Sequence, residues 1–281
     1  MFFANLDSRC NIFLAKEIRV PNPNSFSTIY AVARNAFREA VRDRVLYNLI
    51  VFVLLLTAAA IFLGELTAGQ EARVVTDLGL SATLIFGVFI EIFVGVSLVW
   101  KELEKRTVYS LLSKPVSRTN FILGKYLGFC VTLLFNTLVM GVGITLALLY
   151  VGGTKYIPGV WPAIYLIFLE MTIITGVAIM FSSFSTPALS ALLTFFVFVI
   201  GHFSSSLRDL AQSMGSDAAL VFFNVVYYLL PNFSNFTVIS NAAIGQHPPA
   251  SMLGFATLYA VVYDIILLTI TAVIFKRRNF K

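Results

Sequence analysis

The sequence predicts an all-α, polytopic membrane protein with six transmembrane helices. Of its 281 residues, 58% are hydrophobic and only 12% are charged, with a mean hydropathy of +0.87. This composition is far too apolar for a soluble domain. Six apolar runs are long enough to cross a bilayer, which takes about 20 helical residues. The basic residues are also concentrated in alternate connecting segments, as expected when those segments lie on one side of a membrane.

The six predicted spans cover residues 45–63, 78–99, 126–150, 163–181, 188–203 and 252–275. A tight turn at Ser182–Pro187 separates the fourth span from the fifth, because proline suits the first turn of a new helix. The outer segment 204–251 contains an apolar stretch, Ala218–Leu230, that is too short to cross. We expect re-entrant or interfacial helices there, on the outer side before the last span, with Pro231 ending the first of them.

The distribution of Lys and Arg orients these spans. Seven of the 20 basic residues precede the first span, six lie in Trp100–Lys125 and four follow Phe275. The segments on the other side hold only Arg73, Lys155 and Arg208. Because cytoplasmic loops carry the excess of Lys and Arg, both termini and the 100–125 segment are predicted to be cytoplasmic.

The chain before the first span divides into two parts. Residues 1–28 are predicted to be a poorly ordered N-terminal extension, and residues 29–281 form a single transmembrane domain. From Ile29 to Arg44, apolar residues share one helical face while Arg34, Arg38 and Arg42 share the other. This pattern predicts an amphipathic helix on the membrane surface, with its arginines directed toward anionic headgroups.

The segment Trp100–Lys125 is the one long polar stretch set between long apolar runs. Its mixed charges suggest a short solvated helix, and Pro115 predicts a turn before a new helix begins at Ser117 or Thr119. Such a corner is either a docking element or an elbow on the membrane surface. Immediately after it, Gly124 and Gly128 are spaced to let two helices approach closely.

Motifs for chemistry are missing from the sequence. The nearest string to a phosphate-binding loop, TNFILGKY, has Thr119 in place of the first glycine and Tyr126 in place of Ser or Thr. No metal-ligand or nucleophile motif occurs, and the two histidines, His202 and His247, are far apart and expected on the outer side. The chain is therefore predicted not to be an enzyme and to hold no cofactor or metal of its own.

Three acidic residues fall near the middle of predicted spans: Glu91, Glu170 and Asp264. An ionised carboxylate there costs about 2.5–3.5 kcal/mol on insertion scales, and no Lys or Arg lies at comparable depth. Two interpretations remain open. The acids can line a cation or proton pathway, or they can be structural groups that are protonated or hydrogen-bonded to neighbours such as Thr132 or Asn136.

The string KELEKRTVYSLLSKPVSRTNFILGKYLG, from Lys101 to Gly128, resembles the hallmark segment of type-2 ABC transporter permeases. The arginine-rich helix, the six spans with cytoplasmic ends, the SSFSTPALSALLT turn and the long outer segment also match that family. Within it, the LLSKPVSR string and LLPN at Leu229–Asn232 are most similar to the permease of the nitrous-oxide-reductase maturation transporter. The resemblance covers about residues 29–281 and does not extend to a substrate.

This resemblance implies a permease that moves a substrate with ATP hydrolysed on a separate ATPase subunit, which also holds the ATP and Mg. It implies a 2:2 assembly with a permease homodimer in a bacterial inner membrane, an optional extracytoplasmic partner and no nucleic acid. The ATPase-coupling residues would be Glu102, Glu104, Arg106, Thr107, Leu111, Leu112, Pro115 and Arg118.

The alternative function is a proton- or cation-coupled secondary transporter that uses Glu91, Glu170 and Asp264. Many such carriers contain an internal repeat, and none relates the first three spans of this chain to the last three. An intramembrane enzyme is less well supported, because no paired carboxylates or nucleophile–base spacing occur.

Overall fold

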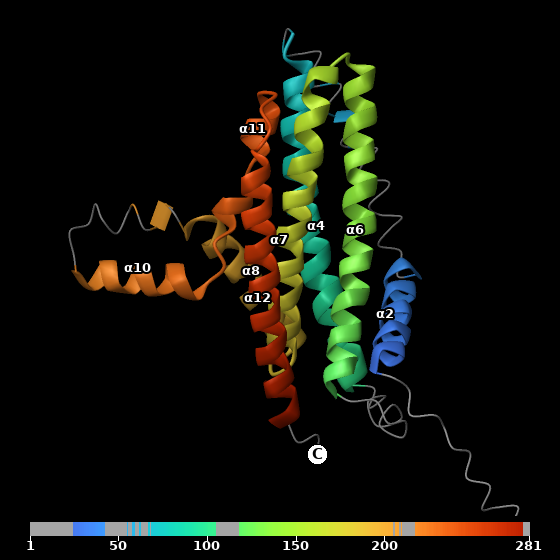
Figure 1. Ribbon diagram of the computed structural model, residues 1–281, viewed down its shortest axis with the longest axis vertical. Coiled ribbons are helices and arrows are strands. Elements are labelled where there is room, and N and C mark those ends of the chain that lie inside the picture. The colour runs from blue at the N-terminus through green and yellow to red at the C-terminus, as the bar shows by residue number, and fades with distance from the viewer. Residues whose placement is uncertain are drawn as a thin grey trace, which may run out of the picture.

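The computed structural model describes residues 25–42, 71–104, 118–204 and 217–277, with single positions between 55 and 70 and between 206 and 209. All regular elements in these ranges are helices, which agrees with the predicted all-α class. Figure 1 shows long helices standing side by side, with one short helix, α10, extending sideways from them.

Four long helices form the bundle: α4 (Glu71–Glu104), α6 (Arg118–Tyr150), α7 (Ile157–Ser182) and α12 (Ala250–Arg277). Each contains an apolar stretch long enough to cross a membrane, which confirms the second, third, fourth and sixth predicted spans as helices of sufficient length. The ends at Glu104, Arg118, Ser182 and Arg277 lie at the bottom of Figure 1 and are called the lower end here.

The other two predicted spans fare differently. The first, residues 45–63, lies outside the described residues except for four single helical positions. The fifth, residues 188–203, forms α8 (Pro187–His202), which has only 16 residues. At about 1.5 Å per residue this helix is some 24 Å long, and it rises from the lower end only part of the way up the bundle. α8 therefore matches the predicted residues but is not among the helices long enough to cross a membrane, so the fifth crossing is not confirmed.

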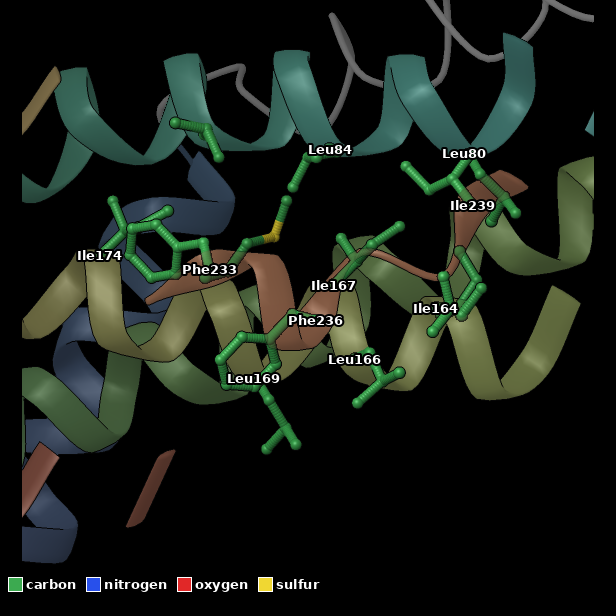
Figure 2. Close-up of a cluster of buried hydrophobic side chains, with 14 of the residues drawn as sticks. Leu80, Leu84, Ile164, Leu166, Ile167, Leu169, Ile174, Phe233, Phe236 and Ile239 are labelled. Atoms are coloured by element: carbon green, nitrogen blue, oxygen red, sulfur yellow. The ribbon is translucent and has the colours of Figure 1, made fainter. Parts of the chain in front are cut away.

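α7 occupies the centre of the bundle. Its apolar stretch is 78% buried, whereas that of α12 is only 22% buried. The sequence of α7 is apolar on all sides, which is the pattern of a helix surrounded by other helices. Figure 2 shows Leu80 and Leu84 of α4 facing the α7 side chains, with Phe233 and Phe236 in the same cluster.

The turn between α7 and α8 agrees with the prediction. α7 ends at Ser182, and Pro187 is the first residue of α8. The amides of Ser183 and Ser185 donate to carbonyls of the last turn of α7, so the helix end leaves few unsatisfied groups. The hydroxyl oxygens of Ser185 and Ser190 lie 2.6 Å apart, and this hydrogen bond connects the turn to α8.

After α8 the chain turns outward and then returns into the bundle. α10 (Asp217–Leu229) ends just before Pro231, as predicted, and exposes Val221, Val225 and Tyr228. The short 3-10 helix η2 (Phe233–Phe236) then buries both of its phenylalanines against α7 and α8. α11 (Ile239–Ala243) follows and packs against α4 and α7. At η2 the chain therefore packs back against the core of the bundle.

Asn232 holds the return of this segment in place. Its amide N–H donates to the Tyr259 hydroxyl of α12 at 2.9 Å, and its side-chain N–H₂ donates to Tyr227 at 3.1 Å. Its side-chain oxygen accepts from the Ser204 hydroxyl and from the Ser234 amide. Irregular backbone is tolerated inside a membrane bundle only where such partners replace water. One buried asparagine thus joins α10, η2 and α12.

The predicted amphipathic helix forms α2 (Ser25–Arg42), which begins four residues before the expected start at Ile29 and packs against the lower part of α6. Gly124 and Gly128 form the contact on α6. A Cβ on Gly128 would lie 2.6 Å from the Ala33 carbonyl oxygen, so only glycine allows this approach. The side chain of Lys125 is 3% exposed and reaches Glu39 of α2 at 3.5 Å.

We expect Gly128→Ala to detach α2 from α6, because the added methyl meets backbone that cannot move aside. Overpacking of this kind costs about 1–3 kcal/mol, which corresponds to roughly tenfold more of the detached state. A cysteine at Ala36, which is fully buried in the contact, would report the change through its rate of alkylation in a chain lacking Cys10 and Cys130.

Gly254→Ala on α12 is the matched control, since nothing lies within 4 Å of its Cβ position. Equal alkylation rates in Gly128→Ala and the parent chain would show that the contact between α2 and α6 is not made in the membrane.

Candidate functional site: a polar core inside the bundle

The three predicted intramembrane acids come from three different helices and lie at similar heights. Glu91, Glu170 and Asp264 precede the lower ends of their helices, at Glu104, Ser182 and Arg277, by 12 or 13 residues. All three are buried, with exposed fractions of 4%, 1% and 8%. Glu91 lies within electrostatic range of both other carboxyl groups. The structure therefore brings the three acids into one region of the bundle.

Glu170 of α7 meets His202 at the end of α8. The histidine Nδ1 lies 3.3 Å from Glu170 Oε1, although the two atoms do not have hydrogen-bond geometry. The imidazole also packs against the rings of Phe198 and Phe233. His202 was expected on the outer side of the membrane, and this prediction was wrong because α8 ends inside the bundle.

Asp264 of α12 faces α6 and α7. The Tyr126 hydroxyl is close enough to interact with its carboxyl group, whereas the Thr172 hydroxyl donates its hydrogen to the Leu169 carbonyl at 2.7 Å. A Cβ on Gly176 would be 3.5 Å from Asp264 Oδ1, so the missing side chain of this glycine leaves room for the carboxyl group. Oδ1 itself has no hydrogen-bond partner in the described structure.

Glu91 of α4 is the least compensated of the three acids. Neither of its carboxyl oxygens has a hydrogen-bond partner among the described residues. Thr132, one of the partners expected from the sequence, donates its hydroxyl hydrogen to the Gly128 carbonyl at 3.0 Å. The other, Asn136, is buried, and its own side-chain oxygen has no partner within the described ranges.

This arrangement suits the movement or storage of protons or small cations better than bond-breaking chemistry. Within the described residues, no three His, Cys, Asp or Glu side chains are placed to hold a metal ion together. Carboxyl oxygens without partners in a low-dielectric interior are costly, and such groups are commonly found on substrate or ion pathways. The same groups can equally be protonated and structural, which leaves both interpretations open.

The length of the predicted fifth helix could have indicated that His202 lies inside the bundle. A 16-residue helix that starts at Pro187 cannot bring residue 202 to the opposite surface. Counting turns from the predicted lower ends places the three acids at similar heights, but it does not show that their helices are neighbours.

Three of the eight predicted ATPase-coupling residues lie in described helices, at the lower end of the bundle. Glu102 and Glu104 are in the last turns of α4, and Arg118 is the first residue of α6. The other five, Arg106, Thr107, Leu111, Leu112 and Pro115, lie outside the described residues. The charged stretch after Trp100 continues α4 as far as Glu104 instead of starting a separate helix. The new helix at residue 118 agrees with the predicted start at 117 or 119.

Comparison with known proteins gives one family. The model of the family described as ABC-2 family transporter protein matches residues 30–280 of the chain. A comparison with curated proteins finds no match.

We expect Glu91→Gln to fold with a thermal midpoint no lower than that of the parent chain, because the acid loses no hydrogen bond and the amide cannot ionise. Glu39→Gln is the matched control. The same exchange there removes a charge 3.5 Å from a buried ammonium group and should cost on the order of 1 kcal/mol. Thermal unfolding of the purified chains in detergent measures both.

A fall in midpoint for Glu91→Gln as large as that for Glu39→Gln would mean that the Glu91 carboxyl is stabilising. Loss of transport at an unchanged midpoint would instead place Glu91 on the pathway.

Proposed function

Since the chain belongs to the ABC-2 transporter family, we propose that it is the transmembrane permease of an ABC exporter and is driven through its 100–125 segment by a separate ATPase subunit. The general part of this function follows from the family: the chain is a multi-pass membrane component of an ABC transporter and not itself an enzyme. ATP and Mg would then bind to the partner.

The observation that supports coupling through residues 100–125 is the connection that this segment makes. It joins the lower end of α4 directly to the lower end of α6, two helices that pack on each other and on the central α7. Packed helices move as rigid units, so force applied to this corner would reach the centre of the bundle. The chain has no phosphate-binding loop of its own.

The remaining parts of the proposal concern the assembly. We place two copies of the permease with two ATPases in a bacterial inner membrane, with both termini cytoplasmic. Within the family, the LLSKPVSR and LLPN strings favour the nitrous-oxide-reductase maturation subgroup. Asn232, the last residue of LLPN, also holds the return of the outer segment through its hydrogen bonds with Ser204 and Tyr259.

A secondary transporter driven by Glu91, Glu170 and Asp264 is not favoured by the family. The polar core does not require that function, because a proton or cation pathway can also exist inside an ATP-driven permease.

The coupling proposal predicts that Leu111→Ala combined with Leu112→Ala releases the ATPase. Truncating a buried interface anchor costs about 2 kcal/mol or more, which weakens binding some thirtyfold. Glu102→Ala alone should weaken binding only mildly and mainly alter its salt dependence. Co-purification of the ATPase with the tagged permease measures both effects.

Leu146→Ala combined with Leu149→Ala is the control, because both leucines are exposed on α6, far from the corner. Co-purification that survives deletion of residues 102–113, in a correctly inserted chain, would place the docking surface elsewhere.

The topology predicts which positions an impermeant thiol reagent can reach from outside intact cells. In a chain lacking Cys10 and Cys130, single cysteines at Thr154 and Gln246 should be labelled, whereas those at Ser110 and Lys276 should not. Labelling at Ser110 from outside would reverse the predicted orientation.

A further inference from the structure

A groove of about 510 Å³ lies between α2 and the lower part of α6. Its walls are apolar except for one charged side chain, Arg34. The side chains that line it include Phe26, Tyr30 and Arg34 of α2 and Leu127, Val131 and Leu134 of α6. The volume is within the range of small-molecule binding sites.

The groove exists because of how α2 is attached. The contact at Gly124 and Gly128 holds one edge of α2 against α6. The neighbouring edge of α2 stands away from α6 and leaves Phe26 82% and Tyr30 63% exposed. Across the gap, Val131 and Leu134 of α6 are also half exposed. Two apolar surfaces therefore face each other with space between them.

The charge at the groove has no acidic partner within the described residues. Arg34 is exposed, and no acidic side chain pairs with it among the described residues. Glu39, the one acid in the sequence of α2, pairs instead with Lys125 on the α6 side. An occupant that matches this surface has an apolar chain for the walls and an anionic group for the guanidinium.

We propose that this groove binds one anionic phospholipid, with an acyl chain between α2 and α6 and its phosphate at Arg34. Basic residues beside membrane helices on the cytoplasmic side commonly bind anionic headgroups. The predicted first span, residues 45–63, carries no acidic residue that could pair with Arg34. The lipid satisfies both the apolar walls and the charge, and the site is independent of the transported substrate.

The test uses the purified full-length chain in detergent, titrated with phosphatidylglycerol or with phosphatidylcholine of the same acyl chains. Bound lipid is counted by native mass spectrometry. One phosphatidylglycerol should bind in preference to phosphatidylcholine, and Arg34→Gln should weaken it roughly tenfold, the effect of one lost charge-assisted contact. Arg38→Gln is the matched control, because Arg38 is exposed on the same helix but does not line the groove.

A second pair of variants tests the groove without touching a charge. Val131→Phe fills the space between the helices and should abolish the preference for phosphatidylglycerol. Val142→Phe should leave the preference unchanged, because Val142 lies on α6 outside the groove. Its exposed fraction, 47%, is close to the 50% of Val131. These variants separate occupancy of the groove from attraction to basic charge.

Three results would overturn the proposal. Equal losses in Arg34→Gln and Arg38→Gln would indicate diffuse attraction to a basic surface. Binding unaffected by Val131→Phe would place the lipid elsewhere. Disulfide formation between a cysteine at Val131 and one within residues 51–58 of the same chain, or at Val131 of a second copy, would identify a protein segment as the occupant.

Discussion

The bundle depends on one constraint: α7 carries a buried acid, Glu170, that lipid cannot accommodate, so other helices must surround it. α4, α6, α8 and α12 all pack on α7. Inside a membrane the apolar effect does not drive such contacts, so close packing and small residues must do so. Gly87 receives the end of the Met171 side chain, and Gly176 lies against Leu267 and Asp264. The outer helices can therefore remain exposed to lipid on their far sides, as α12 is over most of its length.

The short helix α8 creates a second requirement, because its upper end stops inside the bundle. The chain must turn there, and a turn exposes backbone groups that lipid cannot satisfy. Asn232, Ser204 and Tyr259 supply the hydrogen bonds, and Phe233 and Phe236 fill the volume above α8 that a longer helix would have occupied. The same turn brings His202 to Glu170. A polar contact in the core is thus a consequence of helix length.

The sequence was sufficient wherever a signal is local. The lengths of the apolar runs located α6 and α12. Pro187 marked the start of α8 and Pro231 the end of α10, and the row of arginines identified α2. It failed where a position depends on distant residues. The depth of His202 follows from packing against Phe233, about thirty residues later in the chain. Gly124 and Gly128 pack against α2, a helix that the sequence had assigned only to the membrane surface. The acids were identified individually, but their proximity required the relative heights of three helices.

The first turns of α6 connect features that the sequence presents separately. Arg118 is the first residue of α6 and belongs to the 100–125 segment. Gly124 and Gly128 contact α2, and Tyr126 lies beside Asp264 in the polar core. These residues are within three turns of one rigid helix, so none can be displaced along the axis without the others. A force on the corner would therefore change the contact with α2 and the surroundings of Asp264 at the same time. Close-packed contacts of this kind switch between discrete arrangements instead of stretching, because interiors are dense and resist compression. If the proposed coupling operates, motion at the membrane surface would reach the buried acids through the lower end of α6.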